Sequence, residues 1–227
     1  MEDVFPLRRI LVLFVLLGAL VLGWLRWRDA SQRVQPNETA GPVIIKEPVH
    51  FSNRTFDPAS PPADMPPLNT GEGAECDSNF LSNANVGGET RQLDSTHATV
   101  TIHRIKITLQ LNITIWTPLG VSQHVIEHED GHRRISESYY ETADKVAGEI
   151  AERYMGKQMD IVGADLNAES SGILQQMANE ITAEYGKELN PEPAQLLYDS
   201  ITDHSRNEVV AKDAVVHALK NVAIESR

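Results

Sequence analysis

Residues 121–140 read VSQHVIEHEDGHRRISESYY, and at their centre stands the pattern H-E-x-x-H, formed by His128, Glu129 and His132. Two histidines four positions apart lie one above the other on the same face of an α-helix, so both imidazoles can point at a single ion. Glu129 projects beside such an ion rather than onto it. The stretch therefore predicts a helical metal site with a carboxylate placed for proton transfer.

The residues around this motif have the periodicity of a helix. Apolar side chains recur at spacings of one, three, four and seven residues between Val125 and Ile150, and Ser122 is suited to the N-cap position. We therefore expect one long helix that ends near Gly156. The ion that suits two imidazoles and a neighbouring glutamate is Zn²⁺, which lowers the pKa of a bound water from about 15.7 to about 7. We expect one zinc ion, with Glu129 as the general base.

A catalytic zinc ion takes three protein ligands, and the motif supplies two. Glu152 is a poor third ligand because an unbroken helix would carry it about 30 Å from His132. A third histidine six residues after the motif is also absent, since that position is Ser138. Of the remaining candidates, His217 lies among apolar residues in the middle of a predicted helix, whereas His204 lies in a polar segment just before it. We therefore predict His204 as the third ligand.

Two further candidates, Tyr198 and Asp199, precede His204 closely. A carboxylate can orient a metal-bound imidazole by accepting its second N–H, and a tyrosine hydroxyl can stabilise an oxyanion. We predict the oxyanion role for Tyr198 and the orienting role for Asp199, with Asp203 as the alternative.

A long alternating segment leads into the motif. Ala98, Val100 and Ile102 alternate with polar residues, and from Ile105 to Ile115 the apolar residues fall on odd numbers instead. This phase shift across residues 103–104 predicts a β-bulge or a break between two strands. A single apolar face predicts a sheet covered on one side. Residues 108–116 are also a candidate strand edge for binding a substrate backbone.

The rest of the chain predicts further helices over residues 167–188 and 207–224, the first ending before Asn190 and Pro191. The expected fold class is therefore α+β. In it, a small antiparallel or mixed sheet packs on the long motif helix and on two further helices.

The N-terminal part predicts a membrane anchor. Residues 10–25 carry no charge, Arg8, Arg9 and Arg26 flank them, and Trp24 suits the membrane interface. We expect a transmembrane signal anchor, with a cleaved signal peptide as the alternative. Residues 1–9 then lie in the cytoplasm, and the remainder of the chain is exported.

Proline-rich residues 26–78 predict a semi-rigid tether, in which residues 43–45 and 49–51 could each add a short strand to the domain. The functional domain is expected over residues 79–227.

Charge and cysteine content exclude several functions. The net charge of the 227 residues is −12, which excludes nucleic acid as the partner. Cys76 is the only cysteine, so neither an internal disulfide nor a cysteine metal cluster can form.

The segments IEHEDGHRRI at 126–135 and YDSITDHS at 198–205 resemble a bacterial domain-of-unknown-function family described as predicted secreted zinc-dependent proteases. Members carry an HEQGH-type helix and a later YDxxTxHG-type motif, and the similarity covers roughly residues 93–219. Asp130 replaces the usual glutamine, and Ser205 stands where glycine is common. The resemblance implies a zincin-like peptidase fold, a periplasmic or extracellular location, and His204 as a metal ligand.

These observations favour a membrane-anchored zinc peptidase that acts on a polypeptide or cell-envelope substrate from the inner membrane. Hydrolysis of another amide, such as a cell-wall linkage, would use the same chemistry. The alternative from a different class is a non-catalytic, metal-binding envelope protein that acts through protein contacts.

Overall fold

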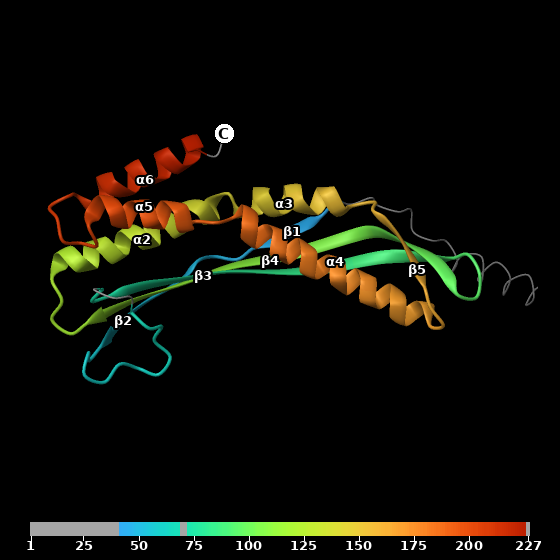
Figure 1. Ribbon diagram of the computed structural model, residues 1–227, viewed down its shortest axis with the longest axis horizontal. Coiled ribbons are helices and arrows are strands. Elements are labelled where there is room, and N and C mark those ends of the chain that lie inside the picture. Colours follow the sequence, from blue (N-terminus) through green and yellow to red (C-terminus); the bar gives the residue numbers. More distant parts are fainter. Residues whose placement is uncertain (1–40, 69–71, 226–227) are drawn as a thin grey trace, which may run out of the picture. The chain divides into compact units, whose positions relative to one another are not determined.

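The computed structural model describes residues 41–68 and 72–225, which fold into an α+β unit (Figure 1). The predicted anchor, residues 10–25, lies outside these residues, as do residues 1–9 and the first part of the predicted tether. In the described ranges, every helix is too short or too polar to cross a bilayer.

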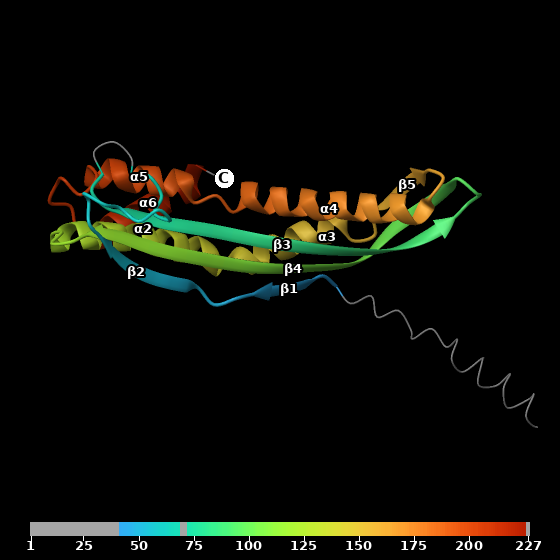
Figure 2. The same cartoon turned by 90° about the horizontal axis from the view of Figure 1, so that it is seen from below.

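The sheet is built around one central strand, β4 (His97–Pro118). Strand β3 (Glu75–Gln92) runs antiparallel along one side of β4. Three shorter strands follow one another along its other side: β2 (His50–Phe56) and β1 (Val43–Lys46) are parallel to β4, and β5 (Gln158–Val162) is antiparallel (Figure 2). The sheet is therefore mixed, and β3 forms one of its edges.

The phase shift in β4 corresponds to a β-bulge. Gly87 pairs with Arg104 and Gly88 pairs with Ile102, so His103 is the extra residue. The bulge keeps the apolar residues before and after it on the same face of the sheet. The prediction of a bulge or break at this point is confirmed as a bulge within a continuous strand.

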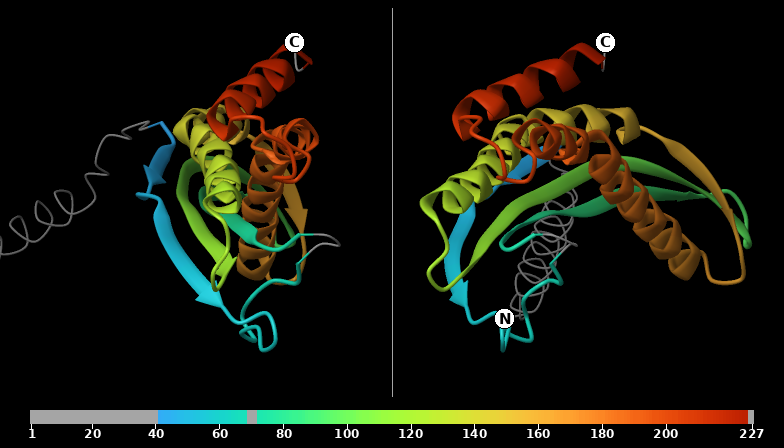
Figure 3. Two further views of the ribbon diagram at one scale, coloured as in Figure 1. Left: turned by 90° about the vertical axis from the view of Figure 1, so that its left-hand side faces the viewer. Right: turned by 60° about the vertical axis from the view of Figure 1, so that its left-hand side comes forward.

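Helices cover the apolar face of the sheet (Figure 3). Ile107, Leu109, Leu111 and Ile113 of β4 are each at most 1% exposed, and burying such a side chain stabilises the fold by about 1.5–3 kcal/mol. The covering helices are α2 (Gln123–Glu141), α3 (Ala143–Tyr154) and α4 (Leu166–Glu188). The last two helices, α5 (Glu192–Thr202) and α6 (Ala211–Glu225), pack against α2 and against each other.

Two expectations about helices need correction. The predicted single motif helix is divided at Thr142, which caps α2 and whose hydroxyl donates to the carbonyl of Tyr139, so α3 begins as a separate helix. Residues 192–202 form α5, which the sequence analysis did not predict. Pro191 and Pro193 were interpreted as a stop signal, but proline is also favoured in the first turn of a helix.

Two expectations about strands also need correction. Residues 43–46 and 50–56 lie in the predicted tether, where 43–45 and 49–51 were expected as possible short strands; both form strands that pair with β4, so the folded unit begins well before residue 79. The predicted substrate-binding edge at 108–116 is not an edge, because β3 pairs with β4 on one side while β1 and β2 pair with it on the other.

Candidate metal centre

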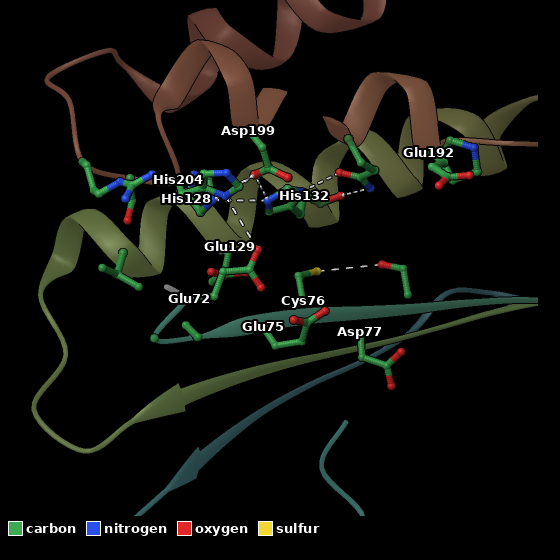
Figure 4. Close-up of a pocket in the computed structure, with 18 of the residues that line it drawn as sticks. Glu72, Glu75, Cys76, Asp77, His128, Glu129, His132, Glu192, Asp199 and His204 are labelled. Atoms are coloured by element: carbon green, nitrogen blue, oxygen red, sulfur yellow. Dashed lines mark hydrogen bonds and ion pairs between the residues drawn. The ribbon is translucent and has the colours of Figure 1, made fainter. Parts of the chain in front are cut away.

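Helices α2 and α5 bring the candidate metal ligands together (Figure 4). Ser122 accepts a hydrogen bond from the backbone N–H of Val125 and caps the N-terminus of α2, which begins one turn before the motif. His128 and Glu129 are each only 6% exposed. Burial of such polar side chains is costly unless other groups, or a ligand, satisfy them.

Three possible ligand atoms converge on one point. His128 Nε2 lies 3.2 Å from His132 Nε2, and Asp199 Oδ1 lies 3.4 Å and 2.9 Å from these two nitrogens respectively. In the described part of the chain, this is the only group of three histidine, cysteine or carboxylate side chains whose ligand atoms all lie within 4.8 Å of one another. The two motif histidines therefore face the same point, as predicted, and the third possible ligand at this point is a carboxylate.

Gln195 of α5 fixes the orientation of the His132 ring. Its amide nitrogen donates to the carbonyl of His132 and to the hydroxyl of Ser136, so its oxygen must face His132 Nδ1, at 2.6 Å. A carbonyl oxygen only accepts, and Nδ1 of His132 must therefore carry the proton. When this ring is neutral, as metal binding requires, the lone pair of Nε2 is directed at the point where the ligand atoms converge.

Tyr198 packs against the motif through the space left by Gly131. Its ring stacks on His128 at 5.0 Å, and its hydroxyl donates to the His128 carbonyl at 3.1 Å. A Cβ atom at Gly131 would lie 2.1 Å from that hydroxyl oxygen, so only glycine allows this packing. The predicted oxyanion role for Tyr198 has no support in this geometry, because the hydroxyl is buried against α2 and Tyr198 does not line the pocket.

Asp199 is held in its ionised form. Burial acts to raise its pKa, but hydrogen bonds from His128 and His132 outweigh burial and hold the pKa well below its usual range. Conversely, burial acts to lower the pKa of His132, while the hydrogen bond to Asp199 raises it. The prediction that Asp199 supports the site is refined, because its carboxylate is itself a member of the converging set.

His204, the predicted third ligand, lies beside this set rather than in it. Its Nδ1 is 3.8 Å from Asp199 Oδ1 and 3.6 Å from Glu72 Oε1, and its side chain is 40% exposed. It follows α5 in a loop where Asp203, His204 and Ser205 all have positive φ angles, between 45° and 63°. This left-handed turn, uncommon for residues other than glycine, places the ring at the pocket wall and leaves Asp199 nearest the two histidines.

A pocket of about 550 Å³ lies in front of the converging atoms. Glu129 lines it, and burial, with Glu75 and Glu72 nearby, raises the pKa of Glu129 to about 7. The wall across from α2 is the start of edge strand β3, with Glu75 and Cys76 (Figure 4). A carboxylate with a pKa of about 7 that faces a cavity beside two histidines can both accept and donate a proton near neutral pH.

Comparisons with models of protein families, with curated proteins and with solved structures found no match for this chain.

Proposed function

We propose that this protein is a zinc-dependent hydrolase of peptide or related amide bonds, with His128, His132 and Asp199 as the metal ligands and Glu129 as the general base. The observation that carries the proposal is the convergence of two imidazole nitrogens and one carboxylate oxygen beside a buried glutamate at the wall of a pocket. The H-E-x-x-H motif and the resemblance of its flanking segments support the same conclusion.

The separations of the converging atoms fit a tetrahedral zinc ion. Zinc binds imidazole nitrogen and carboxylate oxygen at about 2.0–2.2 Å, so two ligands at a tetrahedral angle lie about 3.4 Å apart. The observed separations between the three atoms are 2.9, 3.2 and 3.4 Å. Three protein ligands leave a fourth position open, as in catalytic zinc sites.

In the proposed mechanism, the pocket binds the substrate with its scissile carbonyl toward the converging atoms of His128, His132 and Asp199. A zinc ion at this site, when bound, would polarise that carbonyl and lower the pKa of water. Glu129 takes the proton from the attacking water and then delivers it to the leaving amine nitrogen. Gln195 holds the His132 ring, and Asp199 offsets the positive charge of the centre.

The variant Glu129→Gln tests this proposal because it keeps the shape of the side chain and removes the base. Zinc-loaded wild-type protein should cleave peptides from a mixed library, detected by mass spectrometry, while Glu129→Gln should bind about one zinc ion and show at least a 10²-fold lower rate. The variant Asp199→Asn should instead lose zinc. Zinc content would be measured after dialysis.

The second candidate function is a non-catalytic, metal-binding envelope protein. It predicts zinc binding by the wild type and no cleavage by any variant. The placement of buried Glu129 at the pocket wall favours the hydrolase, because metal binding alone does not require a base there.

We also propose that residues 10–25 anchor the protein in the inner membrane, with the zinc domain in the periplasm or extracellular space. Full-length protein should stay in the membrane fraction after alkaline extraction, and an N-terminal reporter should be accessible only from the cytoplasm.

A further inference from the structure

The proposed active-site pocket has an excess of carboxylates. Six of its lining residues are acidic: Glu72, Glu75, Asp77, Glu129, Glu192 and Asp199. Among the lining residues that the structure describes, Arg206 is the only arginine or lysine, and its guanidinium is paired with Asp203 at 3.0 Å. The pocket therefore has a negative potential that its own basic residues do not cancel.

Two of these carboxylates already have roles in the proposed site. Asp199 contacts the two motif histidines, and Glu129 is the proposed base. Glu75 has no such role. Within residues 41–68 and 72–225, its carboxylate has no hydrogen bond or ion pair, although the side chain is half-buried at the pocket wall. Burial and the neighbouring Glu72 raise the pKa of Glu75 to about 7.

An inorganic cation does not account for this arrangement. A calcium ion needs six to eight oxygen ligands that point at one centre. Glu72, Glu75 and Glu129 lie near one another, yet in the described ranges only the set of His128, His132 and Asp199 has three ligand atoms within 4.8 Å of one another. Carboxylates that line a pocket wall but do not point at one centre suit an organic cation, which can contact them from several sides.

We propose that this pocket selects substrates that carry an ammonium or guanidinium group next to the scissile bond, and that Glu75 is the main residue that binds this group. The inference rests on the proposed function, because it concerns the same site. Glu75 begins edge strand β3 and lies across the pocket from α2, so a substrate bound against Glu129 has its neighbouring residue within reach of Glu75 (Figure 4).

Binding to a catalytically inactive protein tests this inference without depending on turnover. Full-length, zinc-loaded Glu129→Gln would be titrated with N-acetylated peptides that differ at one position, which is lysine, norleucine or glutamate. The lysine peptide should bind about tenfold more tightly than the norleucine peptide, and the glutamate peptide should bind most weakly. Adding Glu75→Gln should reduce the preference for lysine to about twofold.

The matched control is Glu89→Gln in the same background. Glu89 lies on the same strand, is exposed and is not part of the pocket, and the change removes the same charge. This control should keep the full preference for lysine. A preference for lysine that survives Glu75→Gln would overturn the inference, and so would equal binding of the three peptides together with no Glu75-dependent gain from a free N-terminus.

A second set of peptides distinguishes the two sources of the cation. Peptides with a free N-terminus and no basic side chain would be compared with their acetylated forms. If only the free amine gives the Glu75-dependent gain, the bound group is the substrate's N-terminus; if only lysine gives it, the group is a side chain. Wild-type cleavage without a charge preference would refute this inference alone, and selective binding without any cleavage would refute the hydrolase alone.

Discussion

Gly131 determines how closely Tyr198 approaches the turn of α2 that carries His128 and His132. It cannot itself bind an ion through a side chain, because it has none. The tyrosine ring occupies the space where a Cβ atom would stand and stacks on His128. One glycine thus allows α5, which carries Asp199 and Gln195, to pack directly on the two histidines.

We predict that Gly131→Ala destabilises the protein by about 1–3 kcal/mol, because the added methyl group overlaps Tyr198 and must displace it. The same change should weaken zinc binding, since Asp199 moves with α5. The matched control is Gly148→Ala in α3, where no atom lies within 4 Å of the added Cβ, and alanine there should be neutral or stabilising by up to about 1 kcal/mol. Urea unfolding of both variants would show whether the difference exists.

The sequence was sufficient to predict the two histidines and Glu129 as site residues. They lie on one helix, where the spacing of residues determines the direction in which each side chain points. The sequence predicted His204 rather than Asp199 as the third ligand, because spacing does not reveal the left-handed turn that contains His204 and follows the helix of Asp199. Gln195 was missed for a similar reason. Its partner, His132, is 63 residues away in sequence, and no local pattern marks a helix residue that bonds to a distant ring.

Glu75 gives the stability of the metal-free protein a specific dependence on pH. Burial and Glu72 raise its pKa from 4.5 to about 7, so the folded state binds this proton more tightly than the unfolded state does. The resulting contribution to stability is complete below pH 4.5 and is lost as the pH rises to about 7. Without a bound cation, ionisation of the Glu75 carboxyl group therefore lowers the stability of the folded state.

We therefore predict that Glu75→Gln is more stable than the wild type above pH 7, by roughly 1–2 kcal/mol after allowance for the partial exposure of the side chain. The two proteins should converge near pH 4.5. Chemical unfolding between pH 4.5 and 8, with a chelator present, would measure this. A difference that stays constant with pH would contradict the assignment, and Glu89→Gln should show no comparable trend.

The bulge at His103 decides which face of β4 each side chain takes. Because His103 is the extra residue, deleting it leaves Val100 and Ile102 on the buried face. Deleting Thr101 instead moves Ala98 and Val100 to the exposed face, or forces the bulge to close with His103 turned inward.

We predict that deletion of His103 costs about 1 kcal/mol, whereas deletion of Thr101 costs at least about 3 kcal/mol, because buried aliphatic side chains then face water. Thermal unfolding of the two deletion variants would compare them. If both deletions were equally harmful, the length of the strand rather than the phase of its side chains would be the critical property.

The alternation in β4 shows how far local patterns predicted the elements. The alternation of apolar and polar residues predicted the strand, its buried face and the irregularity near residue 103, because all three are properties of one segment. Residues 43–45 and 49–51 were predicted only as possible short strands, and their pairing with β4 was not predicted, since these segments are short and border prolines. Proline-rich composition indicated a tether where the structure has a paired edge.

The position of residues 43–78 has a consequence for the whole chain. β1 and β2 pair with β4 on the side opposite β3, and residues 72–78 supply the pocket wall that faces α2. Residues 43–46 and 50–56 are therefore part of the sheet, and residues 75–78 belong to both the sheet and the candidate site.

We predict that a fragment of residues 41–227 folds, whereas a fragment of residues 79–227 does not. The shorter fragment exposes the unpaired edge of β4 at Lys106–Leu109 and Asn112–Pro118, and such an edge promotes aggregation. It also lacks Glu75 and Cys76 of the pocket wall. Soluble yield and a cooperative thermal transition would be compared for the two fragments. A folded, zinc-binding 79–227 fragment would show that residues 43–56 join a domain that is already complete, and the prediction would then be wrong.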